Sequence, residues 1–153
     1  MSASALPMVI SALVTRATEA VPDGTVVADG FALSSDLGAY LMIGVDDPDL
    51  AEATTAAHAE QEWASANYTA RDESGDVTLV AWCSDGADDQ QSARNKVFAI
   101  ADAIEGMCRA DPTLGVTELL WSGFGKTVTL RQGNDALGAT ALLTFTIHFR
   151  ARL

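Results

Sequence analysis

The most regular apolar pattern of the chain lies between residues 84 and 112. Asp88 and Gln91 have the spacing of a capping box at its start, and Pro112 disfavours helical backbone at Asp111. The pattern predicts a long amphipathic helix that begins at Asp88, stops at Asp111 and covers one face of a sheet. Its apolar face, at the i, i+3, i+4, i+7 spacing, consists of Val97, Ile100, Ala101, Ile104, Met107 and Cys108.

The residues before this helix predict a first helix and two strands. Leu6–Val21 carries an apolar face at helical spacing, with Pro7 in its first turn. The β-branched run Thr25–Asp29 predicts a short strand, and the mostly apolar run Gly38–Val45 predicts a strand buried on both faces. Asp46–Gln61 is acidic and then rich in small side chains, which favours an exposed loop with at most a helical turn.

A hairpin is predicted next. Its strands are Glu62–Asp72 and Val77–Ser84, and its turn is Glu73–Asp76. Neither face of the first strand is strongly apolar, so we expect this hairpin to be partly exposed.

Two more strands follow the long helix. Gly115–Gln132 predicts a strand pair or one long strand bent at Gly123 and Gly125, and Gly133–Asp135 is the predicted turn after it. Thr140–Leu153 has the cleanest two-residue alternation. One of its faces holds Ala141, Leu143, Phe145, Ile147, Phe149 and Ala151, and the other holds Leu142, Thr144, Thr146, His148, Arg150 and Arg152.

This order of elements predicts an α+β fold. We expect a mainly antiparallel or mixed β-sheet with two helices packed on one face and one exposed β-hairpin. No internal repeat, linker or second domain is indicated, so residues 1–153 are interpreted as a single domain.

The net charge of −12, from 21 acidic and 9 basic residues, narrows the range of partners. The average electrostatic field of such a chain repels nucleic acid and anionic membranes. The N-terminal apolar run lacks the basic start and the cleavage pattern of a signal peptide, and no apolar run approaches the roughly 20 residues of a membrane span. We therefore expect synthesis in the cytoplasm and no membrane association.

Residues 123–127 end like a phosphate-binding loop, with Gly-Lys-Thr. The glycine that this motif needs is replaced by Leu120, and strand residues follow instead of a helix, so we interpret the segment as a glycine bulge. Asp46, Asp47 and Asp49 lack the spacing of a calcium loop and favour a solvated acidic loop over a weak calcium site. No other spacing of His, Cys or carboxylates predicts a metal site.

Cys83 and Cys108 lie on a strand-like run and on a helix face, which is typical of buried free thiols. Cys83 and His148 would be a nucleophile and a base if they met across a sheet, but nothing local to Cys83 supplies the electropositive surroundings that activate a thiol. The tryptophans are most simply strand packing, with an interface role open for one of them: Trp63, Trp82 and Trp121. The residues alone predict a non-enzymatic protein, without a cofactor, that works through shape and contact.

Several short segments stand in an order that resembles one protein family: Val21–Gly24, Ile43–Pro48, Gln61–Trp63, Arg94, Asp111–Gly115, Arg131–Gly133 and Gly138. The chain resembles the tail terminator (tail completion) proteins of long-tailed phages, most of all those of actinobacterial hosts. The resemblance extends over nearly the whole chain.

This resemblance implies an α+β subunit that forms a homohexameric ring on the last ring of the major tail tube protein. The ring stops tube polymerisation and presents a surface to the head–tail connector (neck) protein. Such a protein lies in the virion at the head–tail junction and is assembled in the host cytoplasm. Six chains of −12 would carry about −72 around a channel through which DNA passes without specific binding.

We expect the hairpin Glu62–Ser84 and the loop Asp46–Gln61 to contact the tail tube or a neighbouring copy. The candidate interface residues are Trp63, Asn67, Tyr68, Arg71, Asp46, Asp47 and Asp49. Three alternatives stay open: a head–tail connector or neck ring protein, a small cytoplasmic enzyme that uses Cys83, and a small ligand-binding α+β domain. A tail tube subunit fits less well, because such subunits devote more of the chain to β-structure.

Overall fold

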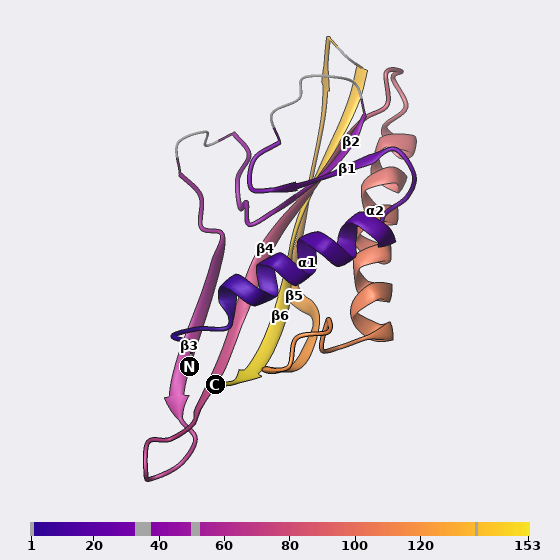
Figure 1. Ribbon diagram of the computed structural model, residues 1–153. Coiled ribbons are helices and arrows are strands. Elements are labelled where there is room, and N and C mark those ends of the chain that lie inside the picture. The colour runs from indigo at the N-terminus through magenta and orange to yellow at the C-terminus, as the bar shows by residue number, and fades with distance from the viewer. Residues whose placement is uncertain (1, 33–37, 50–52, 137) are drawn as a thin grey trace.

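Two helices lie against one face of a mixed sheet in the computed structural model (Figure 1), which describes residues 2–32, 38–49, 53–136 and 138–153. The elements are α1 (Leu6–Ala20), β1 (Thr25–Asp29), β2 (Ala39–Ile43), β3 (Ala57–Trp63), β4 (Arg71–Ser84), α2 (Gln90–Ala110), β5 (Leu119–Asp135) and β6 (Gly138–Arg152). The strand order is β1-β2-β4-β6-β5, and β3 pairs with β4. Only the β1–β2 pair is parallel among the described strands. The predicted α+β fold is confirmed.

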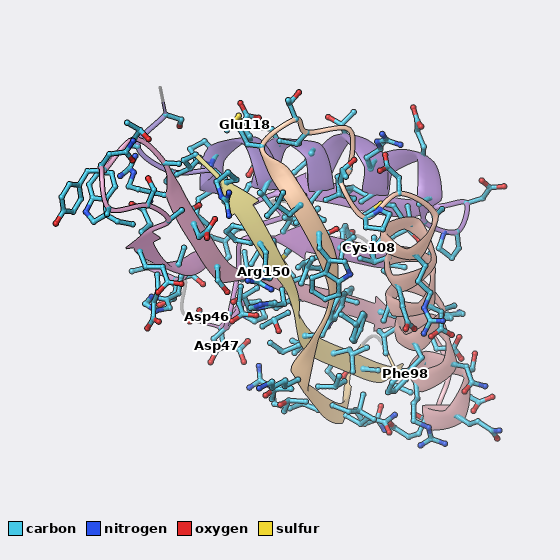
Figure 2. The ribbon with its side chains drawn as sticks, turned by 90° about the horizontal axis from the view of Figure 1, so that it is seen from below. Asp46, Asp47, Phe98, Cys108, Glu118 and Arg150 are labelled. Atoms are coloured by element: carbon cyan, nitrogen blue, oxygen red, sulfur yellow. The ribbon has the colours of Figure 1, made fainter. Side chains whose placement is uncertain are left out.

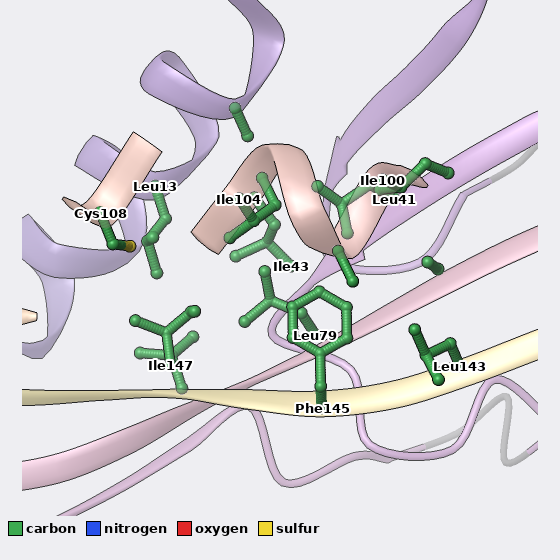
Figure 3. Packing of buried hydrophobic residues seen from close by; sticks show 14 of the residues in the cluster. Leu13, Leu41, Ile43, Leu79, Ile100, Ile104, Cys108, Leu143, Phe145 and Ile147 are labelled. Atoms are coloured by element: carbon green, nitrogen blue, oxygen red, sulfur yellow. The ribbon is translucent and has the colours of Figure 1, made fainter. Parts of the chain in front are cut away.

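The core forms where the apolar faces of both helices meet the sheet. Every second residue of β6 from Ala139 to Ala151 is buried, so the alternation predicted for this strand is confirmed. In Figure 3, Leu13 of α1 and Ile104 of α2 point toward Phe145 and Ile147 of β6. Each fully buried side chain of this size stabilises the fold by about 1.5–3 kcal/mol, which explains why the helical and strand periodicities are so regular here.

Helix α2 stops at Asp111 as predicted but starts one residue later than predicted. Its N-cap is Asp89, whose carboxylate accepts a 3.0 Å hydrogen bond from the backbone N–H of Ser92, so the prediction of Asp88 as the cap is wrong. Asp85 instead accepts hydrogen bonds from Lys96 at 2.5 Å and from the Ser92 hydroxyl at 2.9 Å. Both bonds hold the pKa of Asp85 below its usual value, and the bond from Lys96 has the larger effect.

A smaller apolar cluster lies on the sheet face that points away from the helices, here called the open face. β2 is buried on both sides as predicted: Leu41 and Ile43 belong to the main core, whereas Met42 packs with Val45 and Val80 on the open face. Partly buried residues complete this cluster: Ala28, Phe31, Ala32, Trp82 and Leu142. The cluster extends from β1 and β2 across the open face to Trp82 of β4 and Leu142 of β6.

The hairpin is longer than predicted. β4 runs unbroken through the predicted turn Glu73–Asp76, and β3 begins at Ala57, inside the segment predicted as a loop. The connection between the strands is formed by residues 64–70. Gly75 explains the error, because a Cβ there would lie 2.3 Å from the carbonyl oxygen of His58. The glycine permits β3 to approach closely and does not mark a turn.

β5 is one long strand, which runs through the predicted turn Gly133–Asp135. Its pairing with β6 shifts register between Phe124 and Val128, so the glycine bulge predicted at residues 123–127 is confirmed. At Gly125 a Cβ would lie 1.9 Å from Oγ1 of Thr146, which shows why this position excludes a side chain.

Candidate interaction surface

The hairpin tip, defined as residues 63–71, presents two large aromatic side chains to solvent. Trp63 is 54% exposed and Tyr68 is 66% exposed. Their rings meet edge to face with centroids 5.2 Å apart, and Cζ of Arg71 lies 5.6 Å from the centre of the Trp63 ring. Tryptophan, tyrosine and arginine are the residue types most enriched at binding hot spots. The fold therefore brings three predicted interface residues into one exposed cluster.

Local contacts hold the hairpin tip in one shape. Asn67, another predicted contact, turns its side-chain oxygen toward the loop, where it accepts hydrogen bonds from the hydroxyls of Ser65 at 2.5 Å and Thr69 at 3.0 Å. Tyr68 has a φ of 55°, in the left-handed region that residues other than glycine rarely adopt. Such a conformation costs about 1–3 kcal/mol and is concentrated at functional sites. The loop thus displays the Tyr68 ring at an energetic cost.

A buried carboxylate anchors the base of the hairpin to helix α1. Glu73 is 1% exposed, and its Oε1 accepts hydrogen bonds from the backbone N–H of Ala5 at 2.8 Å and from the hydroxyl of Ser4 at 3.0 Å. Its other oxygen accepts a hydrogen bond from the side-chain amide of Gln61 in β3. Ala5 is the N-cap of α1, so the carboxylate lies at the positive end of the helix dipole. Sequence reasoning missed this residue, because its partners are distant in the chain.

A second exposed apolar group lies on the edge strand β5. Leu120 is 56% exposed and Trp121 is 42% exposed, next to a register shift in the pairing with β6. The Trp121 ring lies 6.0 Å from that of His148 and packs over Gly123. The strand-packing interpretation therefore holds for Trp82, which lies in the open-face cluster, and in part for Trp121, which packs on its strand neighbours but stays 42% exposed. It does not hold for Trp63, which is exposed at the hairpin tip.

Both exposed groups lie at one end of the molecule, where the sheet has the local order β3-β4-β6-β5 (Figure 1). This four-stranded end consists of residues 57–63, 71–77, 147–152 and 119–124. One register row crosses it on the open face: Glu60 lies opposite Ser74, Ser74 opposite Arg150, and Arg150 opposite Trp121. Neither α1 nor α2 lies on this face, and all four residues of the row are exposed.

The predicted acidic contacts lie apart from the hairpin tip. Asp46 accepts a hydrogen bond from the hydroxyl of Thr54, which holds the pKa of Asp46 below its usual value. Arg131 of β5 lies 3.4 Å from Asp47 and 3.5 Å from Asp49. Figure 2 shows Asp46 and Asp47 on the side of the sheet away from α1. Asp47 and Asp49 thus tie the segment after β2 to β5, and the three acids with one arginine form a separate site of net negative charge.

Two exposed cations at or next to the four-stranded end have no carboxylate partner among the described residues. Arg152 pairs with Asp72, and this hydrogen bond raises the pKa of Arg152 above its usual value. In contrast, neither Arg150 nor Lys126 forms an ion pair with any described residue, although both are exposed. Arg71 and Arg94 also lack a described carboxylate partner, but both are only partly exposed and each donates a hydrogen bond to a glutamine side chain.

The thiols and His148 do not meet. Cys83 and Cys108 are free and buried, and burial raises the pKa of both thiols. Cys83 lies opposite Ala141 in the core, whereas His148 lies opposite Asp76 on the open face, seven positions further along β6. The combination of Cys83 as a nucleophile with His148 as its base is therefore wrong.

A serine, a histidine and an aspartate do form a hydrogen-bonded chain on the open face. The Ser74 hydroxyl lies 3.3 Å from Nε2 of His148, and Nδ1 of His148 lies 3.1 Å from Asp76. Nucleophilic catalysis by this order of groups also needs free N–H donors for the oxyanion. Here β4 is paired on both sides, with β3 and with β6, so its backbone N–H groups are used in the sheet. The chain of groups is best explained as structural bonding between β4 and β6.

Two kinds of feature are not found in the described part of the chain, a grouped metal site and a membrane-spanning helix. Within residues 2–32, 38–49, 53–136 and 138–153, no three His, Cys, Asp or Glu side chains are grouped as metal ligands. Neither helix in these ranges has the length and apolar character to cross a bilayer. The exposed surface of the four-stranded end is the candidate site because it gathers the exposed side chains of Trp63, Tyr68, Leu120 and Trp121.

Comparisons with known proteins give no information on this surface. No protein-family model matches the chain, and a search of curated protein sequences finds no similar one.

Proposed function

We propose that this protein is a structural virion subunit that caps the head-proximal end of a phage tail tube as a tail terminator. The observation that carries the proposal is the hairpin tip, an exposed Trp63–Tyr68–Arg71 cluster on a loop that its own contacts hold in shape. A contact surface that is ordered in advance binds without a large loss of conformational entropy. Such a surface fits a subunit that works by docking. The order of short sequence segments by which the chain resembles tail terminators supports the same proposal.

A ring of copies is supported by the edges of the sheet. β5 forms one edge, and β1 and β3 form the other. Uncovered edges carry unpaired backbone donors and acceptors, which pair readily with another chain. When two different edges of the same subunit meet, each copy binds the next head to tail, and the chain of copies closes if the rotation between them permits. We propose six copies, as in the family that the sequence resembles.

The charge distribution is suited to a channel that DNA crosses without binding. Most of the basic side chains are paired with carboxylates of the same chain, which leaves little positive charge for phosphates. These paired cations are Arg16, Lys96, Arg109, Arg131 and Arg152. Six such chains would carry a net charge of about −72 around the DNA, and the negative field of this charge repels the phosphate backbone.

Electron microscopy of particles from a phage whose copy of this gene is disrupted tests the proposal. We expect overlong tails that are not attached to filled heads, and tails of normal length when the intact gene is supplied in trans. Normal infectious virions would overturn the proposal. A second candidate, a head–tail connector or neck ring protein, uses the same docking surfaces, and it predicts tails of normal length that fail to join heads.

A further inference from the structure

We infer that neighbouring copies join by antiparallel pairing of β3 of one copy with residues 119–124 of β5 of the next. This inference rests on the proposed ring and names the two edges that meet in it. Both edges belong to the four-stranded end, at the same level and on opposite sides of the sheet (Figure 1). A copy displaced sideways therefore brings β3 against β5 without any shift along the strands.

The directions of the strands fix the kind of pairing. β3 is antiparallel to β4, β4 is antiparallel to β6, and β6 is antiparallel to β5. β3 and β5 of one copy thus run in opposite directions. Copies related by rotation about an axis along the strands keep these directions, so the new pair is antiparallel and continues the hydrogen-bonded ladder of the sheet.

The side chains of the two edges are complementary in charge. On the open face, the β3 edge carries Glu60 and Glu62, and neither pairs with a lysine or arginine of the described chain. Near the β5 edge lie two exposed cations without a described carboxylate partner. Arg150 belongs to β6 and lies opposite Trp121 of β5, and Lys126 follows the paired segment in the bulge of β5. Pairing of the edges brings the two acids of one copy to the same face, and to the same end of the sheet, as the two cations of the next, with Trp121 between Arg150 and the added strand. Such charge complementarity favours this partner.

The same pairing covers the apolar side chains of the β5 edge. Leu120 and Trp121 lie within the paired segment and are both about half exposed in the single chain. In the register row across the four-stranded end, Trp121 is the last residue on one side and Glu60 the last on the other. Tryptophan at the centre of an interface is a frequent hot spot. Charged residues on an isolated edge also serve to prevent aggregation, and the experiment separates this role from pairing.

Charge reversal on one edge at a time gives the test. Variant one carries Glu60→Lys and Glu62→Lys, and variant two carries Lys126→Glu and Arg150→Glu. Alone, each has two like-charged edges and is expected to lose ring formation and tail-length control. Mixed together, the β5 edge of each variant faces an oppositely charged β3 edge of the other, so alternating rings form and tail length is restored in a phage that lacks the gene.

Two further measurements keep the outcomes distinct. The control Glu19→Lys and Asp102→Lys has the charge change of variant one on the exposed helical surface, and it is expected to act like the wild type. A chain with Glu60→Cys and Leu120→Cys, treated with a short bismaleimide, is expected to give a ladder of cross-linked copies, while the buried Cys83 and Cys108 stay unlabelled.

The result that overturns the pairing is that folded variants one and two each restore tails on their own, or that their mixture fails where the wild type succeeds. Either result leaves the proposed function intact, because the wild-type gene still controls tail length. Normal virions without the gene would instead remove the proposed function itself.

Discussion

The two long hairpins of this protein extend in opposite directions and end differently (Figure 1). The tip of the β3–β4 hairpin exposes Trp63 and Tyr68 and makes contacts mainly within itself. The far end of the β5–β6 hairpin exposes polar residues and is bonded to the start of α2. There Gln132 donates to the carbonyl of Gln90 at 2.9 Å, and Gln90 donates to the carbonyl of Gly133 at 2.8 Å.

This difference shows that the length and exposure of a hairpin do not by themselves mark a binding site. The polar residues at the β5–β6 end hydrogen-bond to the start of α2, and these bonds stabilise the fold. A structural role is therefore sufficient to explain why this end is polar. The β3–β4 tip holds an exposed aromatic residue in a costly backbone conformation, which the fold does not require. We therefore assign docking to the β3–β4 tip and a structural role to the β5–β6 end.

Among changes to the two hairpins, Gly75→Ala in β4 is expected to lower the free energy of unfolding most. The added Cβ would lie 2.3 Å from the His58 carbonyl oxygen, so β3 must move away from β4. We expect a loss of about 3 kcal/mol in the free energy of unfolding, measured by urea denaturation. Gly106→Ala is the matched control, because no atom lies within 4 Å of its added Cβ, and this helical change should be neutral or stabilising. Equal stability of the two variants would contradict the close approach of β3.

Glu73→Ala is expected to have the next largest effect. It leaves the N–H of Ala5 and the side chains of Ser4 and Gln61 without their acceptor. Loss of this buried acceptor should cost about 2 kcal/mol in urea denaturation. Glu62→Ala removes an exposed carboxylate from the same hairpin and should change stability by less than about 0.5 kcal/mol. Similar values for the two variants would show that Glu73 does not anchor the hairpin to α1.

Gln132→Ala sharpens the comparison at the opposite end. It removes the hydrogen bonds to Gln90 and to Arg94, so a loss of about 1 kcal/mol in the free energy of unfolding is expected. Tail-length control by the folded variant should be unchanged. A variant of normal stability that fails to control tail length would move the docking role to the β5–β6 end.

Alkylation of the thiols is the smallest expected effect. Because burial raises the pKa of Cys83 and Cys108, both stay protonated in the folded protein near pH 8, about where a free thiol begins to ionise. We expect slow reaction with iodoacetamide in the native state and full reaction in denaturant, followed by mass spectrometry. Rapid labelling of native Cys83 would instead favour an enzyme that uses this thiol.

The sequence predicts the helix-covered core well because its periodicity reports burial directly. The alternating residues of β6 and the apolar face of α2 each repeat over several turns or pairs, so a local pattern is sufficient. The strand β2, buried on both faces, is equally clear from its continuous apolar run.

The hairpin is predicted poorly because its determinants are not local. Glu73 and Gly75 lie in a stretch with the composition of a turn, yet Glu73 is buried by α1 and Gly75 admits β3. β3 itself contains alanines and charged residues, and it is a strand because β4 pairs with it. The interface role of Trp63, Tyr68 and Arg71 can be predicted from their residue types. The exposure of Trp121 cannot, because it depends on the position of β5 at the edge of the sheet.

The most direct measurement is tail length in a phage that lacks this gene and receives Trp63→Ser with Tyr68→Ser in trans. Both residues are exposed, so the thermal midpoint of the purified variant should match that of the wild type. Micrographs should show tails as overlong as those without the gene, whereas Phe98→Ser, an exposed aromatic change on α2 (Figure 2), should give normal tails. Normal tails with the folded Trp63 and Tyr68 variant would contradict docking through the hairpin tip.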